Sequence, residues 1–66
     1  MYTVTADGVN YMGTYYDSQA GFALRFPSVD NAIAIMRAHI VTVTDPHGDL
    51  IQGLHRSHAV GNIVYF

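Results

Sequence analysis

With 66 residues, the chain can form one small domain but not two, and without cysteine it has no disulfide to stabilise it. Only 12% of the residues are charged, against about a quarter in an average domain, although 50% are hydrophobic. The net charge of −2 argues against a phosphate-binding patch, and no apolar run approaches the ~20 residues of a membrane span. We expect a single domain, residues 1–66, in the cytoplasm.

The first turn signal is Asp7-Gly8, which lies between two segments of alternating apolar and polar residues. A two-residue Asp-Gly loop is typical of a type I′ hairpin turn, because both positions require a positive φ. Strands over residues 2–6 and 9–16 then pair with Ala6 opposite Val9. This register predicts a core-facing side that consists of Tyr2, Val4, Ala6, Val9, Tyr11 and Tyr15.

A third strand over residues 22–26 alternates cleanly and should turn Phe22, Leu24 and Phe26 inward. Pro27 ends this strand, and Ser28 is a good N-cap for a helix from Val29 to about His39. At helical spacing, one stripe is predicted to face the core: Val29, Ala32, Ile33, Met36 and Ile40. The opposite face is small and uncharged: Asn31, Ala34 and Ala38, with Ile35 and His39 on its flank. Alternatively, Ile35 widens the core stripe.

Strands are also predicted at residues 40–44, 49–55 and 62–66, with a type I turn at Asp45-Pro46-His47-Gly48. The sequence therefore predicts an α+β fold of order β-β-β-α-β-β-β. It consists of a single antiparallel sheet of five or six strands with one helix packed across one face. The last strand carries no charged residue, so it needs a partner strand from this chain or from a second copy.

Histidine is the most obvious material for catalysis or metal binding. His55 and His58 could share a metal, but the chain has no cysteine and no third histidine at ligand spacing. Ser57 between them forms no catalytic triad, because neighbouring strand residues point to opposite faces. A sheet with one helix also leaves little room for a pocket of about 300 Å³. We expect no enzymatic activity, no metal and no cofactor.

Nucleic acid is an alternative ligand. Tyr11, Tyr15, Tyr16 and Phe22 could form a stacking surface for single-stranded bases. Lysine is absent and the three arginines are scattered, so positive charge around these rings is missing. The sequence argues against nucleic acid and against a membrane as partners.

Protein binding is the remaining class, and the low charge density and five tyrosines favour it. The uncharged helix face and the apolar C-terminal strand also predict a homodimer. The candidate interface residues are Tyr15, Tyr16, Asp17, Ala34, Ile35, Ala38, His39, Asp45, Asp49, Tyr65 and Phe66.

In size and layout, three strands, a helix and further strands, the chain resembles many small phage-encoded proteins, including some anti-CRISPR inhibitors. This resemblance implies an inhibitor that docks on a host protein or nucleoprotein complex and blocks it. It also implies that the turn aspartates Asp17, Asp45 and Asp49 mimic phosphate charge. Two alternatives stay open: a small protein that binds single-stranded nucleic acid through sheet tyrosines, and a self-assembling structural protein.

Overall fold

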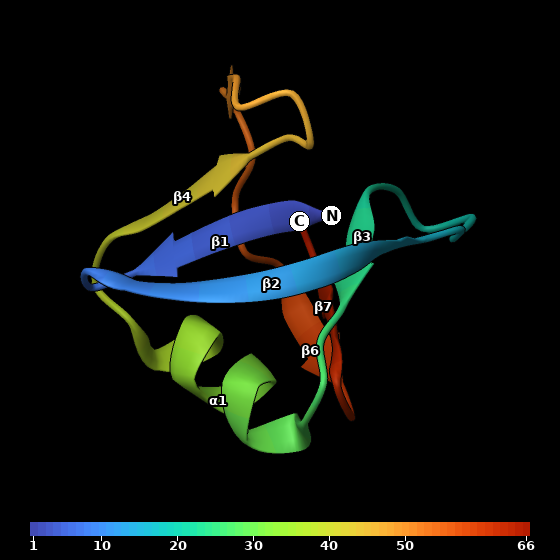
Figure 1. The fold of residues 1–66 in the computed structure, drawn as a ribbon. Coiled ribbons are helices and arrows are strands. Elements are labelled where there is room, and N and C mark those ends of the chain that lie inside the picture. Colours follow the sequence, from blue (N-terminus) through green and yellow to red (C-terminus); the bar gives the residue numbers. More distant parts are fainter.

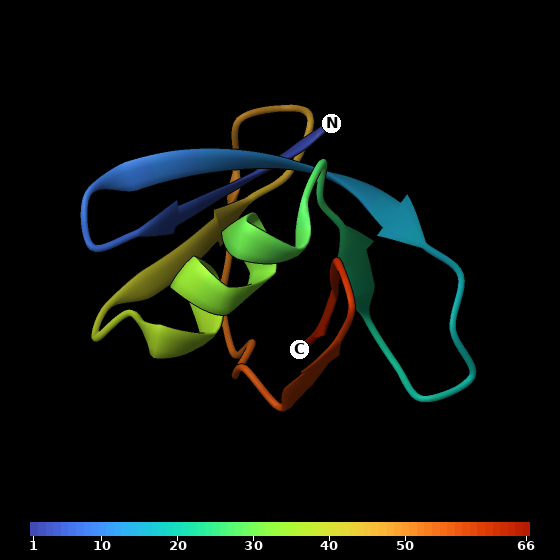
Figure 2. The same ribbon diagram turned by 90° about the horizontal axis from the view of Figure 1, so that it is seen from below.

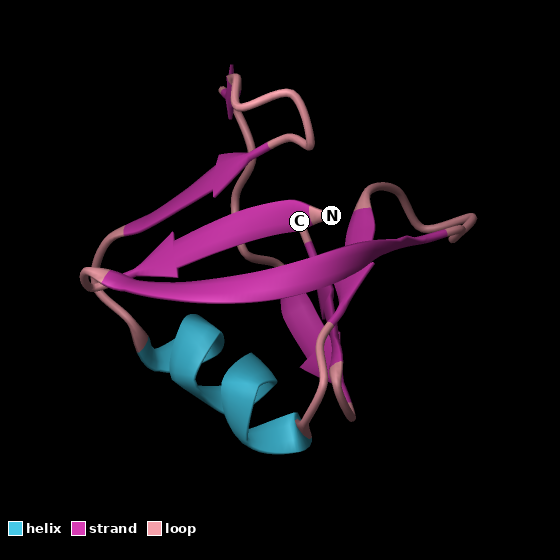
Figure 3. Ribbon diagram, in the orientation of Figure 1, coloured by secondary structure: helices cyan, strands magenta, loops and turns pink.

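The computed structural model describes residues 1–66 and has one antiparallel sheet and one helix (Figures 1 and 3). In chain order the elements are β1 (Tyr2–Ala6), β2 (Val9–Tyr16), β3 (Ala23–Arg25), α1 (Val29–Arg37), β4 (Val41–Thr44), β5 (Leu50–Ile51), β6 (His58–Val60) and β7 (Ile63–Tyr65). Their order across the sheet is β5-β4-β1-β2-β3-β7-β6. The α+β class and the antiparallel sheet are confirmed, but the sheet has seven strands rather than five or six.

The first hairpin has the predicted register. Ala6 lies opposite Val9, and the turn residues Asp7 and Gly8 have φ angles of 49° and 84°. Val4 and Ala6 point into the core. Val9 is exposed although its parity places it on the core side, because it lies at the very end of the hairpin.

The sheet is strongly curled, and the length of one connection requires this. The two edge strands, β5 and β6, are joined directly by residues 52–57, so the Cα atoms of Ile51 and His58 lie at most about 25 Å apart. Laid flat, the sheet would separate its edge strands by about 29 Å at ~4.8 Å per strand. In Figure 1, β3, β6 and β7 accordingly run at a steep angle to β1, β2 and β4.

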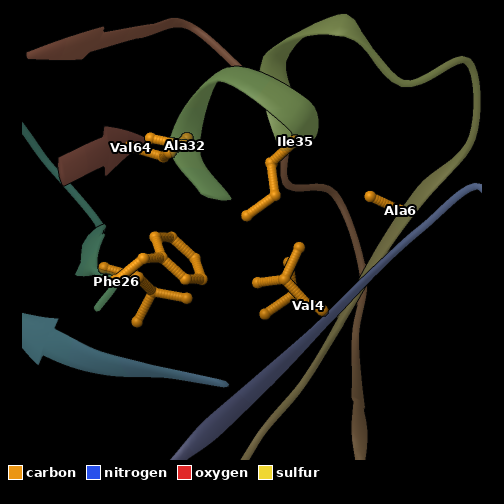
Figure 4. Close-up of a cluster of buried hydrophobic side chains, with 8 residues drawn as sticks. Val4, Ala6, Phe26, Ala32, Ile35 and Val64 are labelled. Atoms are coloured by element: carbon orange, nitrogen blue, oxygen red, sulfur yellow. The ribbon is translucent and has the colours of Figure 1, made fainter. Parts of the chain in front are cut away.

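The helix lies on the concave side of this curled sheet (Figure 2). Its N-terminus is capped as predicted, because the Ser28 hydroxyl accepts a hydrogen bond from the Asn31 N–H at 3.2 Å. Ala32 and Ile35 point from the helix toward side chains of the sheet (Figure 4). The core is one cluster of eight buried residues: Val4, Ala6, Leu24, Phe26, Ala32, Ile35, Val43 and Val64.

The predicted face of the helix was wrong. Ile35, expected on the exposed flank, is fully buried, whereas Val29 and Ile33 are 50% and 46% exposed and Ile40 is 71% exposed. The buried face runs through Ala32, Ile35 and Met36, which are three and four residues apart, so the helix is rotated about its axis relative to the prediction. Small Ala32 allows close approach and Ile35 fills the centre. The predicted stripe was correct for Ala32 and partly for Met36, which packs against the core.

The C-terminal half differs most from the prediction. The long strand expected over residues 49–55 stops at Ile51, and Gly53 has a φ of 81° where the chain leaves the sheet. An unpredicted strand, β6, precedes β7 across a turn in which Gly61 has a φ of 61°. The C-terminal strand is therefore not an edge, because β7 lies between β3 and β6.

A glycine on the core face of β2 lets the two halves of the sheet meet. Residues 9–13 of β2 pair with β1, and residues 14–16 pair with β3. At Gly13, between these two parts, an added Cβ would lie 2.9 Å from Cε1 of Phe26 and 3.2 Å from Cβ of Leu24. Phe26 is among the largest fully buried side chains, so its ring occupies the space that only a glycine leaves free.

We therefore expect Gly13→Ala to destabilise the protein by about 1–3 kcal/mol, the usual cost of overpacking a core. The measurement is the free energy of unfolding from denaturant titration. Phe26→Leu in the same chain should recover part of the loss, because the smaller side chain makes room. If the effects of the two substitutions on the free energy of unfolding were fully additive, the result would contradict this packing.

Candidate functional site

An open groove of about 600 Å³ lies beside β4 and β5, at one edge of the curled sheet. One wall is β4 with β5, and the other is the segment of residues 52–56, the orange stretch in Figures 1 and 2. The sequence argued against an enclosed pocket, and this groove is open rather than enclosed. Apolar side chains contribute much of the lining: Ile40, Val41, Val43, Leu50, Ile51, Leu54 and Phe66.

The groove exposes one unpaired stretch of backbone, at Val41. Successive residues of an antiparallel strand direct their N–H and C=O groups alternately to the two sides. The Ile40 carbonyl accepts from the Asp7 N–H at 2.9 Å and so points toward β1. Val41 then directs its N–H and C=O toward the groove, where β5 pairs only with Val43 and Thr44. Neither group has a hydrogen-bond partner in the protein.

The position of β5 explains this gap. If β5 continued beyond Ile51, the next two residues would lie opposite Thr42 and Val41. Instead, Gly53 takes a positive φ and the chain leaves the ladder. The groove therefore occupies the place that two further residues of β5 would fill.

The ionisable side chains that line the groove are all basic: His39, His55 and Arg56. Arg56 comes from the 52–56 wall, and its Nη1 donates hydrogen bonds to the carbonyl oxygens of Ile35 at 2.8 Å, Met36 at 3.2 Å and Ala38. These carbonyls end the helix, where a cation is favourable. The Nε and Nη2 atoms of Arg56 have no hydrogen-bond partner in the protein, and neither is fully buried, because no buried side-chain nitrogen lacks a partner.

The start of β4 is fixed by Asp7, from the first hairpin turn. Its carboxylate accepts hydrogen bonds from the backbone N–H of His39 at 3.0 Å and of Ile40 at 2.9 Å. The Nδ1 atom of His39 lies 3.6 Å from the same carboxylate. The hydrogen bond from the Ile40 N–H, and to a smaller extent the one from the His39 N–H, lower the pKa of Asp7 below its usual value of 3.8.

The residues predicted to form an interface do not gather on one surface. Only His39 and Phe66 of that set line the groove. Ile35 is buried, and Ala34 and Ala38 are half-buried. Tyr16 and Tyr65 lie on the outer face of the sheet, on the two strands that flank β3. Each ring already contacts another side chain of the protein. Arg25 lies 5.0 Å from the centre of the Tyr16 ring, and His58 stacks on Tyr65 with ring centroids 4.5 Å apart.

The turn aspartates are also separate. Asp45 accepts hydrogen bonds from the backbone N–H of His47 and Asp49, both at 2.9 Å, so its carboxylate holds the β4–β5 turn. Asp17 and Asp49 are exposed in different connections, which lie at different corners of the molecule (Figure 1). The fold does not assemble a single acidic patch from them.

The aromatic rings considered for base stacking do not share a face either. Tyr15 and Tyr16 are neighbours on a strand and point to opposite sides of the sheet. Tyr11 packs against the core. Phe22 lies at the centre of an aromatic cluster, with ring centroids 5.4 Å from Tyr2, 5.7 Å from Tyr15 and 6.1 Å from Phe66.

No three His, Cys, Asp or Glu side chains come together in a geometry that could hold a metal ion. The one helix is also too short and too polar to cross a membrane. Comparison with known proteins gives no match to a family model, to a curated protein or to a solved structure.

The role of Asp7 predicts a pH dependence of stability. A carboxylate whose pKa is lowered on folding stabilises the protein above its unfolded pKa, and this contribution is lost as the pH falls through the folded pKa. Asp7→Asn should therefore lower the free energy of unfolding at neutral pH, and its difference from the wild type should shrink below about pH 3.8. Asp49→Asn, whose carboxylate accepts no hydrogen bond, is the control. An Asp7→Asn difference that is constant from pH 7 to pH 2 would contradict this role.

Proposed function

We propose that this protein is a non-enzymatic protein-binding module that holds an extended segment of another polypeptide in the groove beside β4. The observation that carries the proposal is the unpaired N–H and C=O of Val41 in an apolar groove. Unpaired backbone groups at a sheet edge are a template for another strand. Many binding domains recognise peptides by adding them to a sheet in this way.

The groove offers both parts of such recognition. A peptide residue opposite Val41 would exchange two backbone hydrogen bonds with it. Its side chain would lie on the same side of the sheet as that of Val41, among Leu54 and Phe66. Backbone bonds then supply sequence-independent affinity, and the apolar lining selects an apolar side chain.

Binding of this kind is compatible with an inhibitor, the role implied by the resemblance to small phage proteins. A domain that measures 25 × 24 × 20 Å and covers one extended segment of a host protein or nucleoprotein complex would block that segment sterically. Apolar docking replaces charge mimicry in this proposal, because the turn aspartates lie apart and Asp45 is occupied.

The test is selection from a displayed random peptide library, followed by affinity measurements on the selected peptides. Val41→Thr should weaken binding about tenfold, because a hydroxyl without a partner would be buried against the apolar ligand side chain. Val9→Thr is the matched control, because Val9 is an exposed strand residue outside the groove. It should leave the affinity unchanged.

Equal effects of the two substitutions, or a library that yields no binder, would contradict the proposal. Retention of a single-stranded oligonucleotide that is lost in Tyr16→Ala would instead favour the nucleic-acid alternative, through the face on which Arg25 and Tyr16 stack.

A homodimer stays a prediction, now through β6 rather than the C-terminal strand. β6 is an edge strand that carries no Asp, Glu, Lys or Arg, and its Val60 is 59% exposed. Sedimentation at micromolar concentration should give twice the chain mass of 7.3 kDa, and Val60→Asp should give the monomer. A wild-type protein that sediments as a monomer would show that β6 does not pair.

A further inference from the structure

We infer that the groove recognises the free C-terminal carboxylate of its polypeptide ligand, with Arg56 as the binding residue. This inference rests on the proposed function and adds the ligand class. Three observations together support it: the basic end of the groove, the direction of β5 and the free nitrogens of Arg56.

The direction of the bound strand follows from β5. Leu50 lies opposite Thr44 and Ile51 lies opposite Val43, so β5 runs toward the Val41 end of the groove. A peptide that takes the vacant place beyond β5 in the same antiparallel sense continues in that direction. Its C-terminal end therefore arrives beyond Val41, beside His39 at the start of β4.

The same end of the groove holds the basic side chains. His39 directly precedes the Ile40–Val41 stretch, and Arg56 is tied there by its bonds to the last carbonyls of the helix. No residue of α1 lines the groove, which thus ends where Arg56 meets the helix. A chain that continued past this point would meet the last turn of α1, so a chain that stops there fits better.

The unpaired side of the Arg56 guanidinium group is suited to binding a carboxylate. Its Nη1 is fixed by the helix carbonyls, whereas Nε and Nη2 have no partner in the protein and are not fully buried. These two nitrogens form one side of the guanidinium fork, and that side can donate two parallel hydrogen bonds to a carboxylate. Because the helix already holds the guanidinium in place, little side-chain entropy is lost on binding.

The charges around the site favour an anion. No Asp side chain lines the groove. The nearest carboxylate described at this end is that of Asp7, which is occupied by the backbone N–H groups of His39 and Ile40. A ligand carboxylate would thus meet Arg56, His39 and His55 without a competing acidic side chain in the lining.

The experiment compares three pools of hexapeptides in which threonine alternates with Val, Ile, Leu or Phe. The first pool ends in a free carboxylate, the second in a carboxamide, and the third in a carboxamide with an aspartate inside the sequence. Affinities are measured at pH 7 by fluorescence anisotropy on the folded protein. The free-acid pool should bind roughly tenfold more tightly than the other two, because charge-assisted hydrogen bonds are about twice as strong as neutral ones.

A substitution pair assigns the effect to Arg56. Arg56→Lys keeps a positive charge but loses the fork, so it should reduce the preference for free acid over amide. Arg37→Lys, on the last turn of the helix and outside the groove, should leave the preference unchanged. If Arg56→Lys does not fold, the comparison of peptide pools on the wild type still decides the inference.

The outcomes separate this inference from the proposed function. Equal binding of the acid and amide pools would overturn the carboxylate site while leaving the peptide groove in place. Equal binding of the free-acid and internal-aspartate pools would show that any acidic group suffices and would overturn the terminal assignment. Binding of no pool, together with a failed library selection, would remove the peptide groove itself.

Discussion

The length of the connection between β5 and β6 is the constraint on which the rest of this structure depends. Residues 52–57 join the two outermost strands of a seven-stranded sheet and are too few to span it when flat. The sheet must curl, and a curled sheet gives a chain this small a concave side that one short helix can cover. The groove lies where β5 ends and this connection leaves the sheet, so one connection shapes both the core and the groove.

Two charged side chains hold the end of the helix beside this groove. Arg56, from the connection, bonds the last carbonyls of α1, and Asp7, from the first hairpin, bonds the backbone where the chain enters β4. They fix the two walls of the groove at its basic end. The chain has few charges, and two of the eight serve this one junction. The groove is thus a defined part of the fold rather than an accidental gap.

Local signals in the sequence predicted the N-terminal elements well, whereas β6 was not predicted and the strand expected over residues 49–55 is only two residues long. Asp7-Gly8 fixed the register of the first hairpin and Ser28 the start of the helix, because both act within a few residues. The buried position of Ile35 depends on how the helix is rotated against the sheet, which is a long-range contact. The groove depends on where β5 ends, and Gly53 in an otherwise strand-like segment was a signal that the strand breaks there.

The unpaired backbone of Val41 is the central claim, and amide hydrogen exchange tests it most directly. In the free protein, the Val41 N–H should exchange rapidly, whereas the N–H of Thr42, which points toward β1, should exchange slowly. When a selected peptide is bound, the Val41 N–H should become protected and that of Thr42 should change little. Slow exchange at Val41 in the free protein, or no change there on binding, would contradict strand addition at β4.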